Sequence, residues 1–421
     1  CLYGVRLRMS TQRIKKNFAI IAAGQLISLL GSAVQRFGMS LYLLDLTGSP
    51  GLFAAVLAVS MLPYVLLAPA AGKITDSFSK KKVMIGCDIF SGVVITCYAA
   101  VLFSGNDRSV IITVIMILLS CASTVYGPAV TASVPLAVPD RQLYRANGII
   151  QQIGSAANFA GPVAAGMIYG LLGIRWIVIL NGISFFVSAL MEGFLHLPEE
   201  TGNTGKKVSL AGSVREMYEG FLYLKKSRLV VLKMIISYGL SNLFIVPVFS
   251  VAAPHYIKNV LGMSSEVYGT AEGIIVLGMI TGGMLISAYP GFFSMGGIHR
   301  ILYLMPAAFL FMCLSGILSE AAFLNLMAFT AGGFLVMLSL GLSNVISLTY
   351  MQQAVPGIML GKTSAFSTAA ATAAIPPGQF LFGQILEAGV SVPVLFLFVS
   401  AASLGTAFFV KAAVRSYFKK V

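Results

Sequence analysis

Residues 137–166 read AVPDRQLYRANGIIQQIGSAANFAGPVAAG, and residues 354–383 read AVPGIMLGKTSAFSTAAATAAIPPGQFLFG. Both have the skeleton Ala-Val-Pro, five residues, a basic residue, fifteen residues, Gly, four residues and Gly. The copies start 354 − 137 = 217 residues apart, about half of the 421-residue chain, and match without a gap. Chance similarity between two alanine-rich segments is the alternative. The repeat predicts two halves produced by duplication.

The composition is typical of a membrane protein. Hydrophobic residues make up 57% of the chain and charged residues 10%, with a mean hydropathy of +0.90. One water-soluble core does not bury so much apolar surface. A bilayer core is crossed by about 20 apolar residues in a helix, and the sequence predicts twelve such spans. They are 18–44, 52–72, 83–104, 110–138, 143–173, 175–197, 233–257, 267–289, 299–319, 321–352, 363–388 and 391–413.

The basic residues indicate how the spans are oriented. Twenty-four lie on the side of the N-terminus; three, Arg108, Arg175 and Lys258, lie on the other side, and Arg36 lies within a span. Cytoplasmic loops retain Lys and Arg, so both termini and the linker 198–232 are predicted in the cytoplasm of a cell-membrane protein. The net charge of +14 then reflects topology and contact with the lipid bilayer, and indicates no nucleic-acid partner.

The repeat and the spans together predict the fold class. We expect an all-α membrane protein with twelve transmembrane helices in two pseudo-symmetric six-helix bundles, at 1–197 and 233–421, joined by the cytoplasmic linker 198–232. Carriers built in this way rock two bundles about a site near the midplane.

Sequence motifs of other classes are missing. GIMLGKTS at 357–364 has three residues, where a P-loop has four, between its two glycines, and no strand precedes it. HExxH and GxSxG do not occur, and the three histidines are far apart. The cysteines within spans, Cys87, Cys97, Cys121 and Cys313, form no CxxC motif, so we interpret them as packing residues. The sequence therefore predicts neither an enzyme nor an ATP-driven pump, and no metal or cofactor.

Several motifs resemble the major facilitator superfamily, and more closely its twelve-helix drug-proton antiporter branch, which includes macrolide-efflux and enterobactin-export proteins. They are LTGSP at 46–50, AGKITDSFSKKKVMIGCDIFSG at 71–92, RANGIIQQ at 145–152, AGPVAAG at 160–166, LNGISFFVSAL at 180–190 and YEGFLYLKKSRL at 218–229. The resemblance implies a monomer that exports amphipathic small molecules, such as drugs or macrolides, in exchange for protons. A siderophore or lipid exporter of the same fold, and a nontransporting receptor or scramblase, are the alternatives.

The resemblance also implies a conformational lock at the cytoplasmic surface. In the family, the loop after the second helix stabilises the outward-facing state. Asp76 is expected near the N-terminus of helix 363–388, whose partial positive charge attracts an anion. The lysines of this loop serve topology equally well. The lock candidates are Gly72, Asp76, Lys80, Lys81, Lys82 and Arg145, and Lys362 is the duplicate of Arg145.

A second motif resembles the Gly-Pro motif of antiporters, which bends the fifth helix. Its residues are Gly161, Pro162, Gly166 and Gly170; the second copy of the repeat has Glu387 in place of the last glycine. Gly278 and Gly282 form another GxxxG pair. The resemblance implies that helices 143–173 and 267–289 meet across the two halves. Small residues let membrane helices approach closely, so we expect these two helices to slide past one another there. Lipid-facing glycines are the alternative.

Four charged residues lie within spans: Arg36, Asp88, Glu192 and Glu272. A charge at the bilayer centre costs at least about 2.5 kcal/mol and normally has a partner. Arg36 lies about 13 Å and Glu272 about 8 Å from the outer ends of their helices, so we predict a pair that bridges the halves. Asp88 is a candidate proton carrier, or else a helix-end carboxylate. Glu192 is close to the helix end and is interpreted as interfacial.

Polar residues within spans are candidates for a substrate cavity, although most such residues only hold helices together. The 28 Phe and 19 Met residues can form walls that adapt to bulky apolar solutes. The cavity candidates are Gln25, Tyr126, Gln151, Gln152, Asn158, Asn181, Asn242, Asn344 and Gln352.

Overall fold

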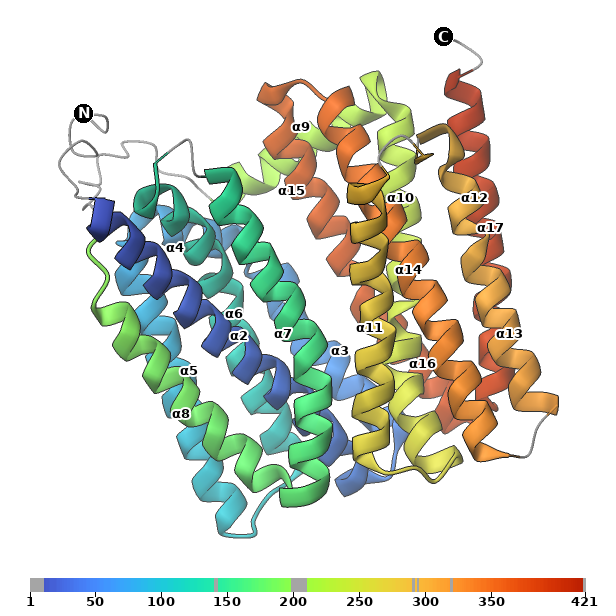
Figure 1. Cartoon of the computed structure of the whole chain (residues 1–421), viewed down its shortest axis with the longest axis horizontal. Coiled ribbons are helices and arrows are strands. Elements are labelled where there is room, and N and C mark those ends of the chain that lie inside the picture. The colour runs from blue at the N-terminus through green and yellow to red at the C-terminus, as the bar shows by residue number, and fades with distance from the viewer. Residues whose placement is uncertain are drawn as a thin grey trace. The chain divides into compact units, whose positions relative to one another are not determined.

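The computed structural model describes residues 11–139, 143–197, 210–289, 292–293, 295–318 and 321–418. Within these ranges all regular secondary structure is helical and no residue belongs to a β-strand (Figure 1). The predicted all-α fold class is therefore confirmed.

The helices of the first half of the chain follow the predicted spans closely. Gly105 lies in the connection between Phe103 and Ser109, and Gly173 lies in the one between Leu172 and Ile174. Both have a positive φ angle, at which a residue with a side chain would be strained. The helices are α2 (Thr11–Thr47), α3 (Pro50–Leu66), α4 (Ala68–Ser77), α5 (Lys80–Phe103), α6 (Ser109–Ala137), α7 (Leu143–Leu172) and α8 (Ile174–Gly193).

The second half begins with a helix inside the predicted linker. This helix is α9 (Leu210–Ser227), and it precedes the spans. The remaining elements are α10 (Leu229–Phe244), the π-helices η2 (Val248–Ala252) and η3 (His255–Val260), α11 (Ser265–Ala288), the 3₁₀-helix η5 (Met295–Gly297), α12 (Ile298–Leu302), α13 (Leu304–Leu318), α14 (Ala322–Ala354), α15 (Gly357–Ala373), α16 (Ile375–Glu387) and α17 (Val392–Phe418).

Ten helical stretches among the described residues are long and apolar enough to cross a membrane, and they coincide with ten of the twelve predicted spans. The chain is thus a multi-pass membrane protein. The other two predicted spans, 52–72 and 363–388, are interrupted helices. One break falls before Pro69 and the other before Pro376. Proline lacks the N–H that continues a helix, which explains both breaks. For these two segments, crossing the membrane remains a prediction.

The chain forms two compact units. The first unit contains Cys1–Leu43 and Ser60–Ser213, and the second contains Leu44–Val59 and Val214–Val421. The outer end of α2 and the first part of α3 thus belong with the second unit. The predicted bundle boundaries place them in the first.

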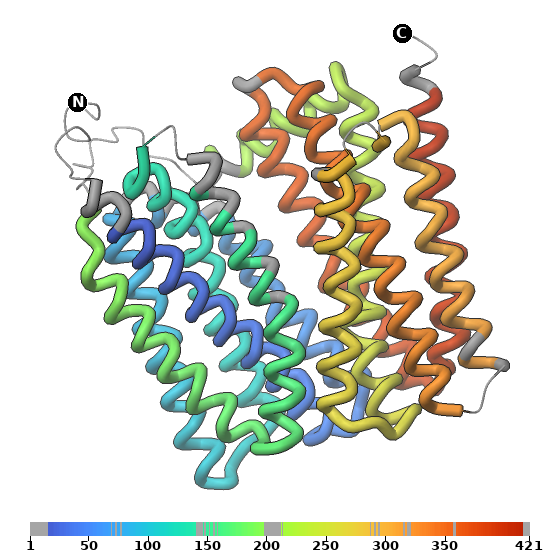
Figure 2. Tube along the Cα trace, viewed as in Figure 1, coloured from blue at the N-terminus to red at the C-terminus, as the bar shows by residue number. Residues whose placement is uncertain are grey.

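Close helix packing in the second unit depends on glycine. Helices α11 and α14 run side by side (Figures 1 and 2). A Cβ atom added at Gly282 would lie 2.6 Å from the backbone oxygen of Leu338, and one at Gly278 would collide with the backbone of Phe334. The GxxxG pair therefore packs α11 against α14 inside one unit. The prediction that these glycines lie where the two halves meet is wrong.

Candidate functional site

Helix α2 carries a glycine at every seventh position, and this stripe lets α8 approach it. Gly24, Gly31 and Gly38 all face α8. A Cβ at Gly31 would lie 2.6 Å from Asn181 Oδ1, and one at Gly38 would collide with Ile177. Two helices in such close contact exclude water from the polar side chains between them, which places those side chains in a low-dielectric setting.

Two carboxyl groups are buried in the first unit. Asp88 on α5 is 2% exposed and Glu192 on α8 is 0% exposed. Ser28 Oγ donates a hydrogen bond to Asp88 Oδ1 at 3.2 Å, and the Tyr126 hydroxyl donates to Glu192 Oε1 at 2.8 Å. The second oxygen of each carboxyl group is buried without a hydrogen-bond partner in the described part of the chain. Each group therefore has one satisfied and one unsatisfied oxygen.

The two carboxyl groups are close enough to interact electrostatically, and the Ser188 hydroxyl lies beside Asp88 and Tyr126. None of the ion pairs among the described residues includes Asp88 or Glu192. Two like charges without a cation are unfavourable in a low-dielectric region. One proton on the pair removes that repulsion, so this arrangement can take up and release a proton.

Glu192 lies next to the end of α8, and that end is covered by other residues of the first unit. Its interpretation as interfacial, which concerns its depth in the membrane, stays a prediction. Lys81 Nζ donates hydrogen bonds to the backbone oxygens of Gly193 at 2.6 Å and Leu195 at 2.8 Å. Asn17 Nδ2 donates to the backbone oxygen of His196 at 2.8 Å. A cation at a helix C-terminus satisfies carbonyls that have no partner within the helix.

The sequence contained a signal for this buried acid. Asn181, Ser184, Ser188 and Glu192 recur at intervals of three and four residues, which places them on one face of α8. A polar stripe opposite the glycine stripe of α2 indicates an internal polar contact.

The cavity candidates do not form one group. Tyr126 donates a hydrogen bond to Glu192, and Gln25 Oε1 is buried without a hydrogen-bond partner among the described residues. Asn242 Nδ2 donates to the backbone oxygen of Ala371 at 3.0 Å, which joins α10 to α15. Asn344 lines a pocket of the second unit. Gln152 and Gln352 are exposed. The side chains of Gln151 and Asn158 lie outside the described residues.

A mostly apolar pocket with several polar groups in its wall lies within the first unit between α2, α3, α6 and α8, with a volume of about 70 Å³. The exposed side chain of Arg36 lines this pocket. The Arg36 guanidinium has no acidic or hydrogen-bonding partner within the described residues. Asn181 donates a hydrogen bond to Gln35 in its wall. Glu272 is on α11 of the second unit, near Tyr268. The predicted pairing of Arg36 with Glu272 remains a prediction.

The predicted lock is only partly visible. The side chains of Gly72, Asp76 and Arg145 lie outside the described residues. Lys81 is held by the end of α8, and Lys82 is exposed. Lys80 is partly buried at the start of α5.

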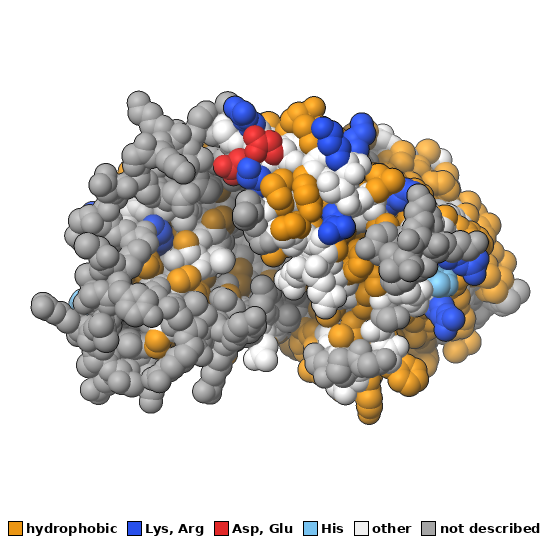
Figure 3. Space-filling model, turned by 90° about the horizontal axis from the view of Figure 1, so that it is seen from above, with side chains coloured by type: hydrophobic (Ala, Val, Ile, Leu, Met, Phe, Trp, Pro, Cys, Tyr) orange, Lys and Arg blue, Asp and Glu red, His pale blue; other side chains and the backbone are white. Residues whose placement is uncertain are grey.

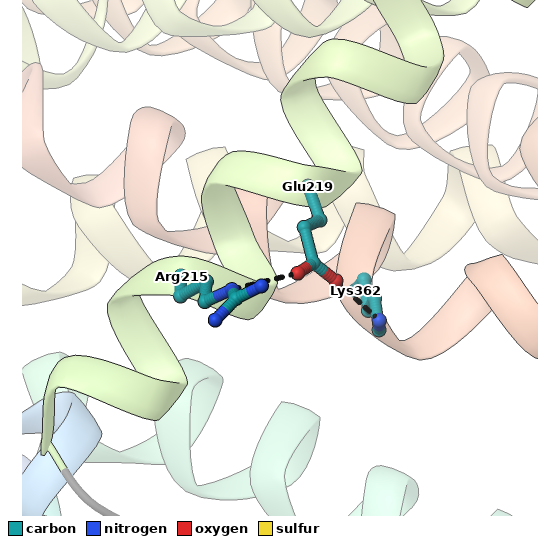
Figure 4. Close-up of polar contacts among 3 residues, drawn as sticks. All are labelled: Arg215, Glu219 and Lys362. Atoms are coloured by element: carbon teal, nitrogen blue, oxygen red, sulfur yellow. Dashed lines mark hydrogen bonds and ion pairs between the residues drawn. The ribbon is translucent and has the colours of Figure 1, made fainter.

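Lys362, the duplicate of Arg145, has a partner that the sequence did not reveal. Its Nζ atom lies 2.7 Å from Glu219 Oε2 on α9, and Glu219 Oε1 lies 3.1 Å from Arg215 Nε (Figure 4). Gly220 lets α9 reach the backbone of α15, because a Cβ there would lie 2.7 Å from the backbone oxygen of Lys362. Hydrogen bonding to Lys362 lowers the pKa of Glu219, and the same contact raises the pKa of Lys362. We call this contact the linker clamp.

In the second unit, the start of α3 is fastened to α16. Glu387 Oε2 accepts hydrogen bonds from the Ser49 hydroxyl at 2.9 Å and from the Gly51 N–H at 3.0 Å. Lys258 of η3 forms an ion pair with Asp45 of α2, which precedes Ser49 in the chain. A carboxylate at a helix N-terminus satisfies donors that have no partner within the helix. We call these three contacts, the two hydrogen bonds of Glu387 and the Lys258–Asp45 ion pair, the outer ties.

The Gly-Pro motif lies within a continuous helix, α7. A Cβ at Gly161 would lie 2.6 Å from Ala33 Cβ, so this glycine packs α7 against α2 in the first unit. Gly166 is buried and Gly170 is exposed. A bend at Pro162 remains a prediction.

Comparison with proteins of known sequence places these features in a family. The sequence profile of the Major Facilitator Superfamily matches residues 21–379. Macrolide efflux protein A of Streptococcus pyogenes is 23% identical over 314 residues, which is 73% of this chain and 75% of that protein. The multidrug efflux pump Tap of Mycobacterium bovis (strain BCG / Pasteur 1173P2) is 24% identical over 243 residues, covering 56% of this chain and 57% of the pump.

Solved structures agree on the fold. The nucleoside transporter NupG is similar with a TM-score of 0.74 at 13% identity, covering 94% of this chain and 98% of that one. A D-xylose-proton symporter is similar with a TM-score of 0.73 at 12% identity, covering 94% and 97%. At such low identity the likeness shows the fold alone. The matched profile covers most of the chain, and the chain belongs to the major facilitator superfamily as a membrane transporter, not an enzyme.

Proposed function

We propose that this protein exports amphipathic small molecules across the cell membrane by alternating access, in exchange for protons. The observation that carries the proposal is the buried pair of Asp88 and Glu192, with the Tyr126 hydroxyl on one oxygen. The efflux function of the relatives supports the direction and the class of substrate.

One titrating group is sufficient for this task. A proton that moves down 100 mV releases about 2.3 kcal/mol, which sustains roughly a 45-fold gradient of a neutral substrate. The carboxyl pair is a single electrostatic unit, because a proton on one group changes the field at the other. We infer that the two groups carry one proton between them through the cycle.

The test is efflux from cells that lack their own pumps. Cells loaded with a panel of fluorescent amphiphiles should export some of them only when this protein is present, and a protonophore should abolish the export. Asp88→Asn and Glu192→Gln should each lower the export rate at least about tenfold, because each removes a titrating group. Glu216→Gln, at an exposed position on α9, is the matched control and should export normally.

Three outcomes separate this proposal from its alternatives. Export that resists the protonophore refutes proton exchange. Unchanged export by both carboxyl variants refutes the assignment of the coupling site. If no amphiphile is exported, the function of a nontransporting receptor or a scramblase is favoured over export.

The charge distribution supports cytoplasmic termini. Lys and Arg side chains are frequent on the face shown in Figure 3. Exposed cations lie at helix ends near the linker and the C-terminus: Lys225, Lys226, Arg300 and Arg415. Positive residues are retained on the cytoplasmic side. We infer that this face is cytoplasmic, and that the protein acts as a monomer.

A further inference from the structure

Arg36 is not used by the proton site, and its guanidinium has no partner among the residues that the structure describes. It lies on α2, within a span, and its exposed side chain lines the pocket of the first unit. A cation at this depth normally pairs with an anion, yet the described residues supply none. A ligand with a negatively charged group can supply the anion that pairs with Arg36.

A second group in the same pocket is also without a partner. Ser120 is 7% exposed, and its Oγ atom has no hydrogen-bond partner within the described ranges of the chain. Buried hydroxyl groups are nearly always hydrogen-bonded, so an unsatisfied one in a pocket wall indicates a place for a polar ligand atom. The hydroxyl groups of Ser32, Ser123 and Tyr64 line the same space. These groups can donate hydrogen bonds to an oxyanion.

The remaining wall is apolar and adaptable. It contains three methionines together with Leu119 and Phe185: Met39, Met61 and Met116. Methionine side chains are flexible and fill irregular space around ligands of different shape. The pocket therefore combines one fixed positive charge with an adaptable apolar wall.

We propose that this pocket binds the negatively charged end of the transported amphiphile, a carboxylate or a phosphate, through Arg36 and Ser120. The inference rests on the proposed export function and narrows it to acidic amphiphiles. An amphiphile whose only charge is a protonated amine is repelled by Arg36 and binds more weakly. A guanidinium offers a planar pair of donors that suits both oxyanions.

The binding test uses one fluorescent body with three end groups. The probes are 11-(dansylamino)undecanoic acid, its neutral methyl amide, and the corresponding primary amine. Each is titrated into the purified full-length protein in an uncharged detergent. The wild type should bind the acid at least about tenfold more tightly than the amide, as expected for hydrogen bonds to a charged group. The amine should bind most weakly.

Variants assign the preference to this pocket. Arg36→Gln should abolish the preference for the acid, while Arg36→Lys should keep part of it because the charge remains. Ser120→Ala should reduce it about three- to tenfold. Arg108→Gln removes an exposed arginine elsewhere in the first unit and should leave it unchanged. Gel filtration and binding of the neutral amide report whether each variant is folded.

Failures of the pocket and of the export function are distinguishable. Equal binding of the acid and the amide by the wild type, or an unchanged preference in folded Arg36→Gln, overturns the pocket assignment even if cells export the amide. Binding that follows the expected order without export in cells contradicts the export function and leaves the pocket in place.

A lipid headgroup carries the same chemistry and is tested separately. The acid is titrated into protein in nanodiscs of phosphatidylcholine, with or without phosphatidylglycerol. Arg36-dependent competition by phosphatidylglycerol identifies the headgroup as the bound anion and overturns the assignment to a transported solute. The same acid affinity in both nanodiscs supports the solute.

Discussion

A methyl group added at Gly161 has no room, whereas one added at Gly154 on the same helix meets nothing within 4 Å. The neighbour of Gly161 is Ala33 Cβ, which is too short to turn away. Gly161→Ala should therefore lower the free energy of unfolding by about 1–3 kcal/mol through overpacking. Gly154→Ala should be neutral or stabilise by up to about 1 kcal/mol, since alanine favours the helix.

Thermal unfolding of both purified variants in one detergent measures this difference. Equal midpoints would show that α2 and α7 are not in the close contact described here. The contact matters for function because α2 carries Ser28, which donates to Asp88, and also carries Arg36.

The site residues show what a sequence reveals and what it does not. Asp88 could be selected as a candidate proton carrier from the sequence, because it is a charged residue inside an apolar run. Its partnership with Glu192 and Tyr126 was not, since these residues are distant in the chain and only packing brings them together. The end of α8 beside Glu192 is capped by Lys81, and this contact also spans more than a hundred positions.

Helix α9 lies in the predicted linker, for which the sequence predicted no helix. The linker clamp holds it against α15. The contact with Lys362 lowers the pKa of Glu219. A carboxylate with a lowered pKa contributes its stabilisation above the ordinary carboxyl pKa of about 4.3, and loses it as the pH falls through the lowered value. The clamp should therefore be intact from pH 5 to 8 and weaken only below pH 4.

Hydrogen exchange in α9, corrected for the intrinsic pH dependence of exchange, checks this pH range. Glu219→Gln should raise exchange in α9 at pH 7, and it should do so more than Glu216→Gln, because Glu216 acts on Lys362 through its charge without a hydrogen bond. Protection that weakens between pH 6 and 7 in the wild type would mean that another titrating group holds the helix.

Helix breaks are the other feature that composition predicts poorly. The apolar runs 52–72 and 363–388 are long enough for one span each, but each is divided at a proline. Hydropathy averages over a window and does not register a lost backbone donor. The positions of the two helix breaks correspond to Pro69 and Pro376 in the sequence.

At the scale of the whole molecule, the second unit includes a piece of the first half of the chain, because Glu387 on α16 accepts hydrogen bonds from Ser49 and Gly51 at the start of α3. Glu387→Gln weakens the acceptor of the Gly51 N–H. The amides of Gly51 and Leu52 should then exchange roughly 2- to 10-fold faster, as expected for the loss of about 0.5–1.5 kcal/mol from a hydrogen bond. Gln384→Ala changes an exposed residue of the same helix and should leave them unchanged.

Hydrogen exchange resolved to single peptides covering 44–59 provides the measurement. Identical protection in both variants would show that Glu387 does not hold this segment. The helical fold followed from hydropathy and the repeat, and the family from the resemblance of several motifs; these ties did not, because Glu387 is more than three hundred residues away from Ser49 and Gly51.

The assignment of Leu44–Val59 to the second unit has a mechanical consequence. The chain passes from one unit to the other inside α2, at Leu43, and returns inside α3, at Val59. An unbroken helix resists bending, so any rotation of the first unit strains two helices before it reaches a flexible loop. Such a rotation would have to bend α2 and α3 themselves, while the outer ties keep Leu44–Val59 on the second unit.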